Sequence, residues 1–169
     1  MNQSELHILS KRVGIKLKQQ SQVLVTAESC TGGGISYAIT DASGSSAWFD
    51  RSFVTYSNEA KMEMLDVQSE TLNEFGAVSE ETVKEMALGA LQYSNGTVSI
   101  SVSGIAGPTG GTEEKPVGTV CFGWADTQGM LEVETMQFSG DREEVRLQAC
   151  WHALERLEDL LDEEMNHKN

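Results

Sequence analysis

Two nucleophilic side chains follow each other at the end of an apolar stretch. Residues 23–27 are mostly apolar and β-branched, which is typical of a buried strand, and Ser29, Cys30 and Thr31 come shortly after them. Three glycines follow, and apolar residues then recur at helical spacing over residues 35–39. Backbone N–H groups at a helix start lack intrahelical partners, and the helix dipole makes that end positive. The pattern therefore predicts a strand–turn–helix unit that can hold a phosphate or a developing oxyanion.

Ser29 is the first candidate nucleophile in this turn. A serine hydroxyl needs a general base before it can attack, and the local pattern alone favours a simpler role, in which Ser29 or Thr31 caps the following helix. Cys30 is the alternative nucleophile, because a helix N-terminus can lower the pKa of a thiol. The turn therefore offers two nucleophiles, and the choice between them depends on the available base.

Histidine, the usual base for either nucleophile, is scarce in this chain. His7 and His152 fall within helical stretches, and His167 lies in the C-terminal tail. This placement disfavours both a Cys–His pair and a Ser–His–Asp triad. A buried structural thiol is the better interpretation of Cys30.

Lys61 is the remaining candidate base. Ser57 or Asn58 can cap a short helix, which puts Lys61 in the first turn of that helix. The positive helix end and burial against aromatic neighbours both favour the neutral amine, the form that can take a proton from Ser29. Tyr56, at the end of the preceding strand, can relay a proton or position a substrate. The simpler alternatives are a solvated surface lysine and an ordinary strand tyrosine.

Arg142 and a glycine-rich loop are candidate contacts for an anionic ligand. Arg142 opens the last predicted helix, where a cation is unfavourable unless an anion binds nearby, and its planar guanidinium suits phosphate. The loop over residues 104–116 contains Gly107, Thr109 and Gly110, and glycines let the backbone approach a ligand closely. The loop lacks the Gly-x-x-x-x-Gly-Lys-Ser/Thr pattern of nucleoside triphosphatases.

The composition describes one acidic globular domain. The chain has 169 residues and a formal net charge of −14, so we expect a single domain over residues 1–169 with a tail that frays after about residue 163. The acidity argues against binding to nucleic acid or to an anionic membrane surface, and no apolar run is long enough to span a bilayer. Three scattered cysteines without metal-ligand spacing favour reduced thiols in a cytoplasmic protein, and we expect no metal and no cofactor.

Helical and strand-like stretches alternate along the chain. Helices are predicted over residues 4–19, 35–41, 58–65, 70–75 and 79–93 and from residue 141 onward. Strands are predicted over residues 23–28, 47–56, 97–103, 117–125 and 130–138. The last two strands form an antiparallel hairpin, so the sheet must be mixed. The alternation predicts an α/β protein, a three-layer α/β/α sandwich.

Six short segments resemble one known family. They are residues 26–33 (TAESCTGG), 44–46 (GSS), 54–61 (VTYSNEAK), 76–79 (GAVS), 103–108 (SGIAGP) and 115–120 (KPVGTV). Together they resemble the bacterial nicotinamide mononucleotide deamidases, stand-alone relatives of the C-terminal domain of the competence- and damage-inducible protein A family, over nearly the whole chain. The resemblance implies an α/β/α amidohydrolase that converts nicotinamide mononucleotide to nicotinic acid mononucleotide and ammonia, and that forms homo-oligomers.

The resemblance also implies a Ser/Lys dyad, with Ser29 as nucleophile, Lys61 as base and Tyr56 nearby. Spacing alone leaves open whether Ser29, Ser46 or Ser103 attacks, and Ser29 is preferred because N–H groups of its own turn can stabilise the oxyanion. The residues expected to contact the substrate are Thr31, Gly32, Gly33, Ser46, Ser103, Gly107, Thr109, Gly110 and Arg142.

Three other hypotheses stay open on the sequence alone. The chain can be a nucleotide-binding module without turnover, or a hydrolase that uses Cys30 on another small amide. It can also be an interaction domain that docks onto the separate domain present in larger family members.

Overall fold

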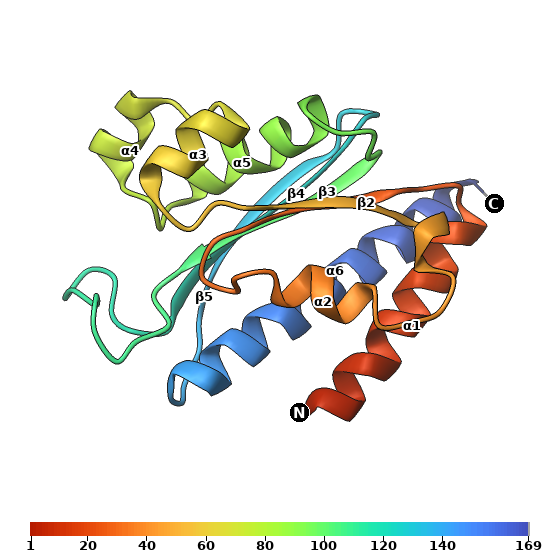
Figure 1. The fold of residues 1–169 in the computed structure, drawn as a ribbon, viewed down its shortest axis with the longest axis horizontal. Helices are drawn as coiled ribbons and strands as arrows, with labels where there is room; N and C mark the ends of the chain where they lie inside the picture. Colours follow the sequence, from red (N-terminus) through yellow and green to blue (C-terminus); the bar gives the residue numbers. More distant parts are fainter. Residues whose placement is uncertain (169) are drawn as a thin grey trace.

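A mixed sheet of five strands separates two layers of helices in the computed structural model, which describes residues 1–168 (Figure 1). The strand order is β2-β1-β3-β4-β5, in which β1, β2 and β3 are parallel and β4 and β5 each run antiparallel to the strand before them. The elements are α1 (Gln3–Gln19), β1 (Leu24–Glu28), α2 (Gly34–Ile39), the 3-10 turn η1 (Ser45–Ala47), β2 (Phe49–Val54), α3 (Asn58–Leu65), α4 (Ser69–Phe75), α5 (Glu80–Gln92), β3 (Val98–Gly104), β4 (Thr119–Asp126), β5 (Leu131–Gln137) and α6 (Arg142–Lys168). The predicted three-layer α/β/α sandwich with a mixed sheet is confirmed.

The connections between the parallel strands pass over opposite faces of the sheet, so the winding of the chain reverses. α1, α2 and α6 lie on one face, and α3, α4 and α5 lie on the other (Figure 1). The connection from β1 to β2 therefore passes over one face, and the connection from β2 to β3 passes over the opposite face. In open α/β sheets, ligands bind at the carboxyl edge of the strands where the winding reverses. In this protein, that position is the carboxyl end of β1.

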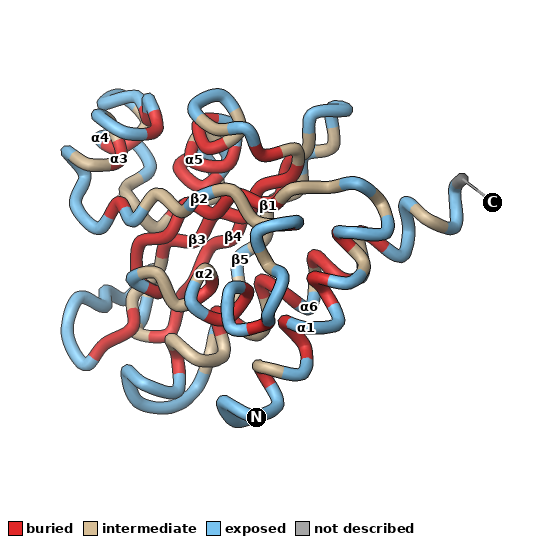
Figure 2. Tube along the Cα trace, turned by 45° about the vertical axis from the view of Figure 1, so that its right-hand side comes forward, coloured by how far each residue is buried: buried red, intermediate tan, exposed pale blue. Residues whose placement is uncertain are grey.

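The central strand β3 is buried on both faces and packs differently on each. Ile100 belongs to the core shared with α1 and α6, whereas Ser99 and Ser101 donate hydrogen bonds of 2.9 and 2.6 Å to backbone carbonyls of α5. The absence of a side chain at Gly123 lets α5 approach closely, since a Cβ atom added there would lie 2.8 Å from the Val83 carbonyl oxygen of α5. The central strands accordingly form the buried layer beneath the helices (Figure 2).

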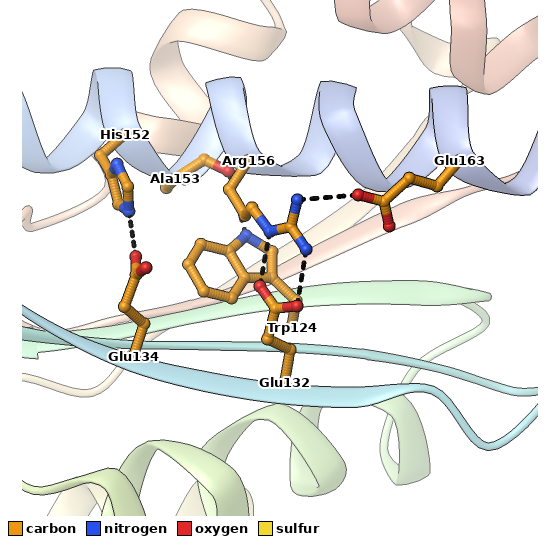
Figure 3. A network of polar contacts seen from close by, with 7 residues as sticks. All are labelled: Trp124, Glu132, Glu134, His152, Ala153, Arg156 and Glu163. Atoms are coloured by element: carbon orange, nitrogen blue, oxygen red, sulfur yellow. Dashed lines mark hydrogen bonds and ion pairs between the residues drawn. The ribbon is translucent and has the colours of Figure 1, made fainter.

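Charged contacts join α6 to the edge strand β5 (Figure 3). The Arg156 guanidinium donates to Glu132 of β5 at 2.5 and 2.7 Å and to Glu163 of its own helix at 3.1 Å. His152 pairs with Glu134, again between α6 and β5. These contacts hold the helix against the sheet, and they explain one histidine of the chain as a structural residue.

The last helix includes the polar segment after residue 163. α6 continues to Lys168. Glutamate, methionine and lysine are good helix formers, so a polar segment can remain helical without burying an apolar face. Across residues 1–168, no helix is long and apolar enough to cross a membrane. The same residues contain no group of three or more His, Cys, Asp or Glu side chains arranged to hold a metal ion.

Candidate active site

The parallel strands bring the predicted nucleophile and the predicted base to the same edge of the sheet. Ser29 follows β1, Lys61 lies in the first turn of the helix after β2, and Ser103 lies at the end of β3. All three line a pocket of about 200 Å³. Its lining residues are Ser29, Cys30, Tyr56, Asn58, Lys61, Ala77, Val78, Ser103, Gly104, Ala106 and Arg142.

Lys61 and Ser29 are in direct contact inside this pocket. Lys61 Nζ lies 3.2 Å from Ser29 Oγ, and only 1% of the lysine is exposed. Nζ also donates to the backbone carbonyls of Thr55 and Tyr56, at 3.1 and 3.4 Å. A neutral amine has two N–H donors and one lone pair, so the carbonyls can take the donors while the lone pair faces the serine hydroxyl.

Burial lowers the pKa of Lys61 below its ordinary value of 10.5, because an ammonium ion loses its hydration in this position. No carboxylate forms an ion pair with Lys61, since its recorded partners are two carbonyls and a hydroxyl among the residues described. Ser57 caps the helix by accepting a hydrogen bond from the N–H of Ala60 at 3.0 Å, which fixes the turn that carries Lys61. The arrangement favours an amine that can accept a proton from Ser29.

Burial disfavours the thiolate form of Cys30, which is the form that acts as a nucleophile. Desolvation raises the pKa of its thiol to about 12, and the side chain belongs to the hydrophobic core. A thiolate is the reactive form of cysteine, so burial makes Cys30 unreactive at neutral pH. The structure therefore agrees with the interpretation of Cys30 as a structural thiol.

Glu28 occupies the start of α2, where the sequence predicted room for an anion. Its carboxylate accepts hydrogen bonds from the N–H groups of Ile35 (2.9 Å) and Ser36 (3.0 Å) and from Thr31 Oγ1 (2.6 Å). The N–H groups of Ile35 and Ser36 are therefore satisfied by a carboxylate of the protein itself, and they are not open to a phosphate or an oxyanion. Glu28 instead ties the turn after Ser29 to the helix that follows.

Replacing Glu28 by glutamine is expected to lower the free energy of unfolding by about 1–3 kcal/mol, because an amide nitrogen would face donors that need an acceptor. The loss should appear as a lower urea midpoint in equilibrium unfolding. Glu63→Gln, at an exposed position on α3, is the matched control and should leave the midpoint unchanged. Equal midpoints for the two variants would contradict a structural role for Glu28.

The glycine N–H groups after Ser29 are only partly available as oxyanion donors. Gly32 N–H donates to the Ser29 carbonyl at 3.0 Å, and Gly34 N–H donates to the Thr31 carbonyl at 2.9 Å. Gly32 was among the expected donors, and it is already used inside the turn. In the part of the chain that the structure describes, the N–H of Thr31 has no recorded acceptor. The N–H of Gly33 likewise donates to no acceptor among the described residues, so Thr31 and Gly33 are the candidate donors that remain.

Arg142 links Tyr56 to the glycine-rich loop at the rim of the pocket. Its guanidinium donates to the Gly107 carbonyl at 2.8 Å and to the Tyr56 hydroxyl at 3.2 Å. The phenol of Tyr56 is therefore joined to Arg142, whereas the backbone carbonyl of Tyr56 contacts Lys61. This geometry favours the positioning role for the Tyr56 side chain over proton relay.

Of the predicted substrate contacts, Ser103 and Arg142 line the pocket, whereas seven do not: Thr31, Gly32, Gly33, Ser46, Gly107, Thr109 and Gly110. Ser46 lies in η1, before β2. The Trp48 carbonyl, just after η1, accepts a hydrogen bond from the N–H of Leu24 at the start of β1. Because β1 and β2 are parallel, Ser46 is at the opposite edge of the sheet from Ser29, and one chain does not bring them together. Thr109 and Gly110 are exposed in the loop that extends from the body of the molecule (Figure 1), and neither lines the pocket.

Arg146 contacts the nucleophile turn and was missed by the sequence reasoning. It donates to the carbonyls of Cys30 (3.0 Å) and Thr31 (3.3 Å) from α6. One signal was available, because Arg146 lies four residues after Arg142 and two such residues share a face of a helix. The distance of 116 residues from Cys30 hides the contact itself from any local pattern.

Fold and site together define a class of protein: an α/β/α domain with a buried serine–lysine pair at the carboxyl edge of a mixed sheet. Residues 6–161 match the family model of the CinA C-terminal domain. The chain belongs to the CinA C-terminal domain family.

Similar proteins support this membership over nearly full length. The nicotinamide-nucleotide amidohydrolase PncC of Enterobacter agglomerans is 57% identical over 155 residues, which cover 92% of this chain and 94% of the relative. The protein of the same name from Escherichia coli strain K12 is 55% identical over 157 residues, covering 93% and 95% of the two chains. The crystal structure of the competence/damage inducible protein CihA from Agrobacterium tumefaciens superposes with a TM-score of 0.91 at 42% identity, covering 96% of this chain and 97% of that one.

Proposed function

We propose that this protein is an amidohydrolase that converts nicotinamide mononucleotide to nicotinic acid mononucleotide and ammonia through an acyl-enzyme on Ser29. The observation that carries the proposal is the buried contact of 3.2 Å between Lys61 Nζ and Ser29 Oγ. The names of the PncC relatives from Enterobacter agglomerans and Escherichia coli support the substrate class.

The first half of the proposed reaction forms the acyl-enzyme. Neutral Lys61 takes the proton of Ser29 Oγ, and the oxygen attacks the carbon of the carboxamide. The N–H of Thr31 stabilises the oxyanion of the tetrahedral intermediate, a type of contact worth roughly 3–4 kcal/mol. The intermediate collapses, the C–N bond breaks, and the ammonium group of Lys61 returns the proton to the departing amine, which leaves as ammonia.

The second half releases the acid. Water enters after ammonia has left, and neutral Lys61 takes one of its protons while the hydroxide attacks the ester carbon. The C–O bond to Ser29 breaks, and Ser29 Oγ recovers the proton from Lys61. The dyad returns to its starting state, and the carboxylate of nicotinic acid mononucleotide is the product.

The surroundings of the dyad offer room for the nucleotide. Arg142 also lines an adjacent depression of about 440 Å³, together with Pro108 and Val117. A guanidinium suits a phosphate group and supplies local positive charge in a chain with a net charge of −14. We propose that the phosphate and ribose lie between Arg142 and the loop that contains Gly107.

The direct test is release of ammonia from nicotinamide mononucleotide by the purified protein in the presence of a chelator. Ammonia and nicotinic acid mononucleotide should form in equal amounts, and added metal ions should not be needed. A protein that binds the nucleotide but releases no ammonia would instead be the non-catalytic module left open by the sequence.

Arg142→Ala is expected to raise KM for nicotinamide mononucleotide by about 10–100-fold, because a charged hydrogen bond to phosphate is worth about 1.5–3 kcal/mol. KM for nicotinamide riboside, which lacks the phosphate, should change little. Steady-state kinetics on both substrates measure the difference. Arg51→Ala removes an exposed arginine on β2 and serves as the control. Equal effects of Arg142→Ala on both substrates would refute a phosphate contact.

A cytoplasmic location and homo-oligomeric assembly are part of the proposal. The cysteines of the described chain are free and buried, which suits a reducing compartment. Sedimentation equilibrium of the purified protein measures the assembly state directly.

A further inference from the structure

Arg146 holds two consecutive peptide groups of the nucleophile turn. Its Nε donates to the Cys30 carbonyl at 3.0 Å, and its Nη2 donates to the Thr31 carbonyl at 3.3 Å. The side chain is half-buried, and a Cβ atom added at Gly32 would lie 3.3 Å from Nη2. The guanidinium therefore fits closely against the turn, and its planar fork spans two acceptors that a single ammonium would hold less well.

These contacts determine which way the next N–H group points. In a planar trans peptide, the carbonyl and the N–H of the same unit point in opposite directions. The Cys30 carbonyl and the Thr31 N–H form one such unit, so a carbonyl directed at Arg146 turns the Thr31 N–H away from Arg146. A peptide flipped by half a turn would present its carbonyl to the oxyanion instead.

Arg146 and the dyad line different hollows, and the peptide between Cys30 and Thr31 connects the two linings. Arg146 lines a hollow of about 790 Å³ together with Thr31 and Cys150, and neither Ser29 nor Lys61 lines it. Ser29 and Lys61 line the pocket of about 200 Å³, and Arg146 does not. An N–H group turned away from Arg146 is turned away from this hollow, and the adjacent residue on the other side of the same peptide, Cys30, lines the pocket of the dyad.

We propose that Arg146 is a positioning residue that orients the peptide between Cys30 and Thr31, so that the Thr31 N–H is a preformed oxyanion donor; this rests on the proposed function. The positive charge at the carbonyl end also polarises the peptide and strengthens the donor at its other end. Arg146 acts through the peptide and needs no contact with the substrate.

Arg146→Met and Arg146→Lys test the proposal through turnover of nicotinamide mononucleotide. Loss of one oxyanion donor lowers kcat by on the order of 10²- to 10³-fold, so we expect a loss near the lower end for Arg146→Met and a loss of about 10-fold for Arg146→Lys. KM should stay within about twofold, because the contact matters in the transition state and not in the ground state. The pH at half-maximal kcat should not move, since Lys61 is intact.

Arg156→Met is the matched control. It removes another guanidinium of the same helix, one that pairs with Glu132 and Glu163 (Figure 3). We expect it to lower Tm while kcat stays at the wild-type value. The proposal is overturned if kcat falls in both Arg156→Met and Arg146→Met, and if the fall in kcat per degree of lost Tm is the same in the two variants. Arg146 would then be only a structural residue.

A second readout does not depend on the natural substrate. A fluorophosphonate reacts when Ser29 Oγ attacks phosphorus and fluoride leaves, while Lys61 takes the serine proton; the phosphoryl oxygen then needs the same donors as an acyl oxyanion. Labelling of Ser29, measured by intact mass, should be slowed in both Arg146 variants and unchanged in Arg156→Met. Added guanidinium should partly restore the labelling rate of Arg146→Ala.

The two proposals can fail separately. If the wild type releases no ammonia but Arg146→Met still slows labelling of Ser29, the substrate is wrong and the positioning role stands. If ammonia is released and both the labelling rate and kcat of Arg146→Met equal those of the wild type, the amidase proposal stands and the positioning role is overturned.

Discussion

Ser29→Ala is expected to lower kcat for ammonia release by on the order of 10⁴- to 10⁶-fold, because removal of a nucleophile eliminates the covalent pathway and leaves only binding and oxyanion stabilisation. The fold should be unaffected, because the substitution removes the hydrogen bond between Ser29 Oγ and Lys61 but leaves the hydrogen bonds between main-chain atoms of the turn in place. Ammonia release and Tm together measure the effect. The wild type, quenched during turnover, should carry the mass of a nicotinoyl nucleotide on the peptide that contains Ser29.

Cys30→Ala is the control for this prediction. The Cys30 thiol is buried and its pKa is raised to about 12, so its removal should leave a small cavity and keep kcat within about 10-fold of the wild type. The reverse result, with activity lost in Cys30→Ala and kept in Ser29→Ala, would move the nucleophile by one residue and support the cysteine hydrolase that the sequence left open.

Lys61→Met should lower kcat by about 10⁴-fold, because the serine loses the base that activates it and the leaving amine loses its acid. The Met side chain keeps the length and apolar character of the buried stem. In the wild type, kcat/KM should rise with pH through the lowered pKa of Lys61, at a midpoint below 10.5, the ordinary pKa of lysine. Rates measured across pH test both statements. A Lys61→Met variant with wild-type activity would exclude the dyad.

The pH dependence of unfolding, compared between the wild type and Lys61→Met, is an independent test of the lowered pKa of Lys61. Burial lowers the pKa of Lys61 in the folded state, so between that pKa and 10.5 the unfolded state binds more protons than the folded state. The free energy of unfolding contributed by Lys61 therefore falls as pH falls from 10.5 toward the lowered pKa. Relative to Lys61→Met, the wild type should gain stability as pH rises through this window. A difference that does not change with pH would show an unshifted lysine.

Local patterns predicted most of the elements correctly because each depends on neighbours in the chain. The start of α6 is an example, since a helix was predicted from residue 141 onward. In the structure, the Asp141 carboxylate accepts the Glu144 N–H at 2.9 Å and the Glu144 carboxylate accepts the Asp141 N–H at 3.1 Å, which is a capping box. The same local reasoning was incomplete at α2. It identified an exposed helix end as an anion site but did not anticipate that Glu28 would fold back onto that end.

The site was predicted in part, and the errors share one cause. Ser29 and Lys61 became candidates because one lies in a turn before a helix, the other at a helix start, and histidine is scarce. The family resemblance, and not these patterns, joined them as nucleophile and base. Ser46 was misplaced because it precedes β2, whereas Ser29 follows β1, and the two strands are parallel. The two serines therefore lie at opposite edges of the sheet, and this can be known only from the order and direction of the strands. Arg146 was missed because its partners lie 116 and 115 residues earlier in the chain.

The sequence by itself determined the alternation of helices and strands and the mixed sheet, since periodicity and capping act over a few positions. It offered Ser29 and Lys61 as candidates, and the family resemblance joined them as a dyad. Only the tertiary structure decided that Lys61 reaches Ser29, because β1 and β2 had to pair in parallel to bring their carboxyl ends together. It also decided the directions in which the pKa values shift, down for Lys61 and up for Cys30, since burial by distant segments alters the free energy of a charged group. The turn after β1 therefore becomes a candidate active site only when α3 and α6 pack against it.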